Sequence, residues 1–164
     1  MNKNVVASRS TLSVQVHVAL FGIFCVVLIG FAFSYPEFYT EVNIFTLIQV
    51  VVMSTIGFRL YRLLQSPKNL IMESEDAFLV CPSKNQEIRV PYSDIKRVEG
   101  DAEMNKSNPY PFGTLLIKTT TQSIVLRNVG KLRESILLIH DKMGKDAENC
   151  DFELIEGKKR VSLP

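Results

Sequence analysis

Tryptophan is absent from this chain of 164 residues, which has only two histidines and three cysteines. The histidines, His17 and His140, are far apart, and no H-E-x-x-H, G-x-S-x-G or glycine-rich phosphate-binding motif occurs. The cysteines, Cys25, Cys81 and Cys150, lack C-x-x-C spacing, so we expect reduced thiols. Because nucleophilic and metal-ligating residues are so sparse, the sequence predicts a protein that is not an enzyme and that binds no cofactor and no metal.

Charge is nearly absent from residues 12–58, where Glu37 and Glu41 are the only acidic or basic residues. The net charge of +2 for the whole chain therefore conceals an apolar N-terminal part and a charged remainder. Nucleic-acid-binding proteins carry a dense basic patch or stripe. With 19 Lys and Arg against 17 Asp and Glu, the composition gives no reason to expect a nucleic-acid partner.

Two long apolar segments fill the N-terminal part. Residues 16–35 carry no formal charge and as a helix would extend about 30 Å, the thickness of a bilayer hydrocarbon core. A secretory signal peptide is the alternative, but the apolar run is long for one and no small-x-small cleavage site follows. We therefore expect transmembrane helices at about 12–35 and 42–64, forming a hairpin module over residues 1–65 after a short N-terminal stub.

The basic residues around these segments predict their orientation. Lys3 and Arg9 precede the first segment, whereas the connector at 36–41 has neither Lys nor Arg. Three cations expected to face the lipid headgroups follow the second segment: Arg59, Arg62 and Lys68. Because cytoplasmic flanks are enriched in Lys and Arg, we expect a multi-pass cell-membrane protein with both termini in the cytoplasm.

Polar and small residues cluster on one side of the second segment. At 100° per residue, five of them fall on an arc about 140° wide. This candidate intramembrane interaction face consists of Asn43, Thr46, Gln49, Ser54 and Gly57. Such residues usually meet another helix, because lipid cannot satisfy an amide. The helix they meet is either the first helix of the same chain or one from a partner protein or a second copy.

From Asn69 onward the pattern becomes that of short strands. Strand-like runs occur at 69–73, 77–81, 87–91, 95–98, 115–118 and 123–127. Residues 101–111 have few large aliphatic side chains and two prolines, which predicts a loop or a loop with an irregular edge strand. Leu132, Ile136, Ile139 and Met143 form one apolar helical stripe. We expect a domain at 67–144 and a polar, basic tail at 145–164, within which Phe152 and Leu154 alternate as in a last short strand.

The segment Val-Pro-Tyr-Ser-Asp-Ile-Lys-Arg-Val-Glu at 90–99 resembles the "I-P-Y-x-D-I-x-x-V" stretch of bacterial pleckstrin-homology-like (PH-like) domains. Those domains often lie directly behind one or two transmembrane helices, and the resemblance covers about residues 67–143. It implies an α+β, mainly β domain of about seven antiparallel strands, capped by one C-terminal amphipathic helix.

These features favour a non-enzymatic, membrane-anchored PH-like interaction or scaffold module at the cytoplasmic face. Its expected partners are the lipid bilayer and either a protein or a second copy of the chain. One alternative is a self-immunity protein that protects a peptide-toxin producer, which some small membrane-anchored proteins resemble. Another is a lipid-headgroup-sensing module, but the first strand pair is acidic, with Glu73, Glu75 and Asp76 and no cluster of cations.

Overall fold

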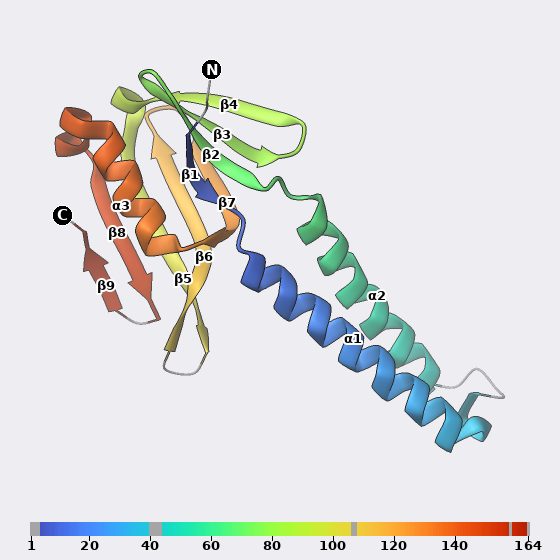
Figure 1. The fold of residues 1–164 in the computed structure, drawn as a ribbon. Coiled ribbons are helices and arrows are strands. Elements are labelled where there is room, and N and C mark those ends of the chain that lie inside the picture. The colour runs from blue at the N-terminus through green and yellow to red at the C-terminus, as the bar shows by residue number, and fades with distance from the viewer. Residues whose placement is uncertain (1–3, 40–43, 106–107, 158, 164) are drawn as a thin grey trace. The chain divides into compact units, whose positions relative to one another are not determined.

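The computed structural model describes residues 4–39, 44–105, 108–157 and 159–163. The chain divides into two compact units, Leu12–Gln65 on the one hand and Met1–Thr11 with Ser66–Pro164 on the other. The first unit is a helical hairpin, and the second is a mostly β domain that ends in a helix and further strands (Figure 1). This confirms the prediction of two long apolar helices followed by a mainly β part with a C-terminal helix.

The hairpin consists of α1 (Thr11–Ser34), a short 3₁₀ helix (Pro36–Tyr39) and α2 (Ile44–Gln65). At 1.5 Å per residue, α1 is about 36 Å long and α2 about 33 Å. Both helices are long and apolar enough to cross a bilayer. Pro36 follows the end of α1 because proline lacks the N–H that would continue the helical hydrogen bonding.

The β domain contains two sheets. Sheet A has the strand order β1-β2-β3-β4 and sheet B has the order β7-β6-β5-β8-β9. The strands of sheet A are β1 (Val5–Ser8), β2 (Asn69–Ser74), β3 (Ala77–Ser83) and β4 (Gln86–Pro91). Sheet B consists of β5 (Ile95–Asn105), β6 (Asn108–Thr119), β7 (Ser123–Gly130), β8 (Asp151–Glu156) and β9 (Lys159–Ser162). The helix α3 (Leu132–Met143) follows β7, and 3₁₀ turns occupy Tyr92–Asp94 and Gly144–Asn149.

The N-terminal stub is part of the β domain, which differs from the predicted division at residue 65. Strand β1 pairs antiparallel with β2, with Ala7 opposite Ile71 and Ser8 opposite Asn69. Val6 and Ala7 are buried in the core of the domain. Four residues are too few for a detectable period, so the sequence alone gave no signal of this strand. The hairpin is therefore an insertion between two neighbouring strands of one sheet.

The tail predicted at 145–164 is also part of the domain. Phe152 and Leu154 are 5% and 2% exposed, because alternate residues of β8 face the core. Strand β8 pairs with β5 in parallel, with Val98 opposite Phe152, and so differs from the antiparallel strands predicted for residues 67–144. Residues 67–144 hold six described strands, β2 to β7, compared with about seven expected, and β1, β8 and β9 bring the number among the described residues to nine.

The loop predicted at 101–111 lies mostly in strands. Residues on both sides of 106–107 extend β5 and β6, with Met104 opposite Pro109. The register shifts between Ala102 and Met104, where the two strands approach very closely. A Cβ atom on Gly113 would lie 2.1 Å from the carbonyl oxygen of Asp101, so only glycine fits at this position. The two prolines were the reason for predicting a loop, but a hairpin with a β-bulge tolerates proline.

One hydrophobic core joins the two sheets and α3. Its fully buried side chains include Phe78 of sheet A and Leu115 of sheet B. The predicted stripe on α3 faces this core, since Ile136 and Ile139 have no exposed surface and Leu132 and Met143 have almost none. The amphipathic helix is therefore held by apolar burial, as its spacing predicted.

A polar contact around Glu73 ties β2 to the N-terminal segment and to α3. The Glu73 carboxylate accepts a hydrogen bond from Asn4 Nδ2 at 3.1 Å and pairs with Lys142 Nζ at 3.1 Å. The Glu73 N–H donates to the Asn4 carbonyl at 2.8 Å. The Asn4 hydrogen bond, followed by the contact with Lys142, lowers the pKa of the Glu73 carboxyl. The acidic turn that sequence analysis noted thus has a structural role at Glu73.

Candidate interaction surfaces

The hairpin packs through one face of each helix. On α1 the partly covered residues include Phe21 and Phe31. On α2 they include Thr46, Gln49 and Gly57. A Cβ atom on Gly57 would lie 3.9 Å from the Phe21 ring, and the rings of Phe31 and Phe45 have centroids 5.2 Å apart. Small and aromatic residues therefore bring α1 and α2 together along this face.

The structure divides the predicted polar arc of α2. Thr46, Gln49 and Gly57 are partly covered, as are Val52, Met53, Ile56 and Leu60 at helical spacing, whereas Ser54 is exposed. Asn43 lies outside the described residues. Three of the five arc residues thus share the face that packs against α1, which favours a role within the hairpin for them.

The remaining surface of the hairpin is apolar and exposed. Phe33 is 84% exposed, Ile44 77% and Val26 70%, and the same is true of most other large side chains outside the packed face. Monomeric soluble proteins rarely expose a continuous apolar surface of this extent. Such an apolar surface is compatible with the hydrocarbon core of a lipid bilayer.

The three predicted headgroup-facing cations have separate surroundings. Arg59 and Arg62 are exposed on the last turns of α2, and the Arg62 guanidinium lies 5.5 Å from the centroid of the Phe58 ring. Lys68 is exposed in the connector between α2 and β2, and its carbonyl accepts a hydrogen bond from the Arg9 N–H at 2.8 Å. Among the described residues, no ion pair or hydrogen bond joins these three side chains to one another, as expected for like charges.

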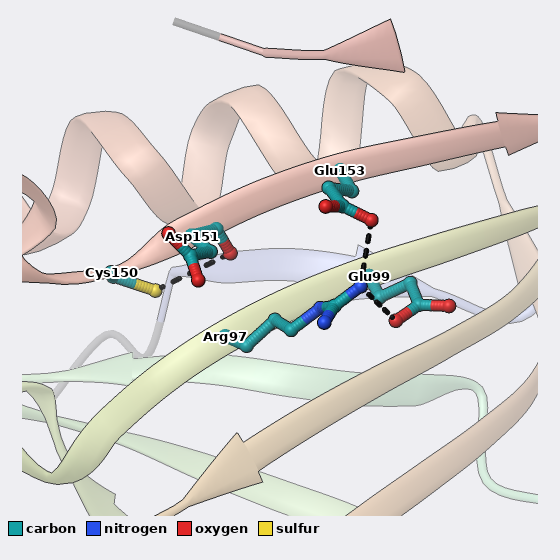
Figure 2. A network of polar contacts seen from close by, with 5 residues as sticks. All are labelled: Arg97, Glu99, Cys150, Asp151 and Glu153. Carbon is teal, nitrogen blue, oxygen red and sulfur yellow. Dashed lines mark hydrogen bonds and ion pairs between the residues drawn. The ribbon is translucent and has the colours of Figure 1, made fainter. Parts of the chain in front are cut away.

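Sheet B carries a charged group that the sequence analysis missed. Arg97 Nη2 lies 2.7 Å from Glu153 Oε2 and 3.0 Å from Glu99 Oε2, so one guanidinium meets two carboxylates (Figure 2). The three side chains are only 18–27% exposed. Arg97 Nε is buried and has no hydrogen-bond partner among the described residues. The alternation of Arg97 and Glu99 along β5 was the sequence signal for this group. Glu153 joins the two residues only because β8 pairs in parallel with β5.

Apolar side chains lie beside this charged group. Leu116 of β6 is opposite Glu99, and Val125 of β7 is opposite Leu116. Directly opposed residues share a face, so all three point away from the core, and Val125 is 48% exposed. We call this surface the outer face of sheet B and define it as Arg97, Glu99, Leu116, Val125 and Glu153.

Cys150 is a half-buried thiol at the start of β8. Its Sγ lies 3.8 Å from the carbonyl oxygen of Asp151 (Figure 2). Burial, followed by the charge of Asp151, raises the pKa of the Cys150 thiol to about 11. The thiol therefore stays protonated at neutral pH and is a poor nucleophile.

Alkylation of Cys150 is therefore expected to be slow in the folded protein. At pH 7 a thiol with a pKa of about 11 is ionised to about one part in ten thousand, against roughly 3% for a free cysteine. We expect iodoacetamide to modify the Cys150 peptide at least about 100-fold more slowly in the native protein than in urea. The native rate should still rise between pH 9 and 10. Equal rates in the two states would show that the thiol is not protected.

A cavity of about 240 Å³ lies between the first turn of α3 and strands β5, β6 and β8. Its apolar lining includes Ala102, Leu132 and Leu154. Its charged lining consists of Lys131, Arg133, Glu134 and Glu156. These formal charges cancel, and the volume is below that of most ligand sites, so the cavity indicates no particular ligand.

The histidines and carboxylates form no metal site in the part of the chain that the structure describes, where no three His, Cys, Asp or Glu side chains are placed to hold an ion. His17 Nδ1 lies 2.8 Å from the Ser13 carbonyl, and the His140 ring packs edge-on against Phe152 with centroids 5.0 Å apart. Both rings thus have local structural contacts.

Comparison of the chain with models of protein families, with curated proteins and with solved structures gives no match.

Proposed function

We propose that this chain is a non-enzymatic, membrane-anchored interaction module that holds a PH-like domain at the cytoplasmic face of the membrane. The observation that carries the proposal is the pairing of β1 with β2, because the apolar hairpin is inserted between these two strands. Both ends of the hairpin must then lie on one side of the bilayer. The cations Arg9, Arg59 and Arg62 at those ends favour the cytoplasmic side.

The strand order supports a PH-like domain. Strands β1–β7 lie in two sheets in chain order, and the amphipathic helix α3 follows β7 directly. Tyr92 in that segment packs against Phe78 with ring centroids 4.6 Å apart, and Ile95 is buried. The pair β8–β9 is an addition to this plan at the edge of sheet B.

We place the contact with a protein partner on the outer face of sheet B. This face combines the exposed Val125 with two carboxylates and with Arg97, and arginine is a residue type enriched at interfaces. A partner that offers an apolar side chain next to a Lys or Arg would complement the excess carboxylate. The polar arc of α2 is the lesser candidate, because Thr46, Gln49 and Gly57 lie on the face that packs against α1.

Chemical crosslinking and co-purification from detergent-solubilised membranes test this assignment. We expect Val125→Asp to lower the yield of the crosslinked partner at least about fivefold, a loss of about 1 kcal/mol. Leu137→Asp, at a 39% exposed position on α3, is the matched control and should retain the partner. Differently tagged copies of the chain show in the same experiment whether the partner is a second copy.

The triple variant Thr46→Val, Gln49→Leu, Ser54→Val tests the arc separately. Intramembrane hydrogen bonds contribute about 1 kcal/mol or less each, so we expect this variant to keep its partner. Loss of the partner in the triple variant, with retention in Val125→Asp, would place the contact on the hairpin. Retention in both variants would contradict a role for either surface.

A further inference from the structure

The connection between β7 and α3 lies beside the residues that lead into the hairpin. The Ser10 N–H donates to the Asn128 carbonyl at 2.7 Å, and Arg9 forms a β-bridge with Val129. A Cβ atom on Gly130 would lie 3.0 Å from the Ser10 Cα. Since Ser10 directly precedes Thr11, where α1 begins, the β7–α3 connection contacts the residue next to the start of α1.

The second connector returns to the same end of the domain. The Lys68 carbonyl accepts a hydrogen bond from the Arg9 N–H at 2.8 Å, and Arg9 Nη1 donates to the Ser66 carbonyl at 2.9 Å. Both connectors and the β7–α3 connection therefore gather at one end of the β domain. This end of the domain is therefore the one that is covalently joined to both helices of the hairpin.

Basic side chains are concentrated at this end. We define the basic collar as Lys68, Arg127, Lys131 and Arg133, all of which are exposed. Two carboxylates lie beside these four cations: Glu134, at 3.0 Å from Lys131 Nζ, and Glu156, which lines the same cavity as Lys131 and Arg133. The cations outnumber these two carboxylates, so the collar keeps a net positive charge. At the other end of α3, by contrast, Lys142 is matched by Glu73 at 3.1 Å.

We propose that the basic collar binds the phosphates of anionic lipid headgroups in the leaflet that the hairpin enters. This rests on the proposed membrane anchor and deepens it, because it assigns the lipid-facing surface of the domain to the β7–α3 connection. Each Lys or Arg near the bilayer surface attracts anionic lipid, and guanidinium groups bind phosphate through paired hydrogen bonds. The headgroups would fix the orientation of the domain on the membrane.

The collar differs from the cations that the sequence singled out. Only Lys68 belongs to both sets, and Arg59 and Arg62 are on α2 itself. Arg127, Lys131 and Arg133 are some sixty residues further along the chain, and the hydrogen bond from Ser10 to Asn128 brings their segment to the hairpin. Lys131 has a left-handed backbone (φ 48°), and its exposed side chain pairs with Glu134 at 3.0 Å.

Hydrogen–deuterium exchange of the full chain in nanodiscs tests the proposal. One set of nanodiscs contains phosphatidylcholine only, and the other contains three parts phosphatidylcholine to one part phosphatidylglycerol. We expect amide exchange in residues 127–138 to be at least about fivefold slower in the anionic nanodiscs. The variant Arg127→Gln, Lys131→Gln, Arg133→Gln should lose this difference, and so should the wild type in concentrated salt.

A matched variant removes three cations elsewhere on the domain: Arg89→Gln, Lys96→Gln, Lys145→Gln. All three are exposed, and this variant should keep the slow exchange. Unchanged exchange in β2 and β3 shows that each variant remains folded. Inorganic phosphate added to phosphatidylcholine nanodiscs should have no effect, and equal slowing by free phosphate would overturn the assignment to lipid.

Equal exchange of residues 127–138 in the two lipids, with the protein retained in the nanodiscs, would contradict the collar alone. Failure of the protein to co-elute with nanodiscs of either composition would contradict the membrane anchor itself. The two failures are therefore distinguishable.

Discussion

Replacement of Ile136 by aspartate is expected to unfold the β domain. Ile136 has no exposed surface, and its Cδ1 fills the space beside Gly100, where an added Cβ would lie 2.5 Å away. A carboxylate at this position loses its hydration without a partner, at a cost of several kcal/mol. Small domains are stable by only about 5–15 kcal/mol in total, so the folded population should fall sharply.

Limited proteolysis of the full chain in detergent micelles measures this effect. We expect Ile136→Asp to be cleaved throughout residues 66–164 under conditions that leave the wild type intact. Leu137→Asp is the neighbouring control, since Leu137 is 39% exposed and should tolerate a charge. If Ile136→Asp resists protease as well as Leu137→Asp does, α3 does not pack on the sheets as described.

Replacement of Val6 by aspartate is expected to destabilise the same β domain. Val6 precedes the hairpin in the sequence, whereas Ile136 follows it. Val6 is 6% exposed and belongs to the core together with Ile71 of the adjacent strand. Loss of its apolar burial and entry of a charge should cost about 2–5 kcal/mol. The matched control is Val5→Asp, because Val5 is 47% exposed and points away from the core.

Urea denaturation followed by exchange in β2 and β3 shows the effect of Val6→Asp. We expect a lower midpoint for Val6→Asp and an almost unchanged one for Val5→Asp. Equal midpoints for Val6→Asp and the wild type would mean that β1 is not a structural part of the domain. In that case the hairpin would merely precede the domain.

Much of the fold follows from local patterns in the sequence. The hairpin is evident from apolar length, and α3 from the spacing of Leu132, Ile136 and Ile139. Strands β2, β3, β4 and β7 begin or end within three residues of their predicted positions, because alternation and turn residues mark them. Each of these elements is recognisable from the pattern of apolar and turn residues within its own short segment.

Long-range pairing escaped the prediction for a physical reason. Strand β1 has four residues, and what makes it a strand is β2, which is more than sixty positions away. The partner of β8 is β5, and this pairing also assembles the group formed by Arg97, Glu99 and Glu153. Charged residues that alternate on a strand look like solvated positions until the neighbouring strand is known. The polar arc of α2 can be recognised from a single helix, whereas the group of Arg97, Glu99 and Glu153 depends on strand pairing and cannot.

Cysteine labelling of intact cells that express the protein tests the inserted hairpin most directly. In a background with Cys25→Ala, Cys81→Ser and Cys150→Ser, single cysteines are placed in the connector and on each side of the hairpin by Glu37→Cys, Val5→Cys and Ser162→Cys. All three positions are exposed. We expect a membrane-impermeant maleimide to label the Glu37→Cys variant from outside, and to label the Val5→Cys and Ser162→Cys variants only after permeabilisation. Labelling of Val5→Cys and Ser162→Cys from opposite sides of the membrane would contradict the account, because β1 and β2 could not then pair.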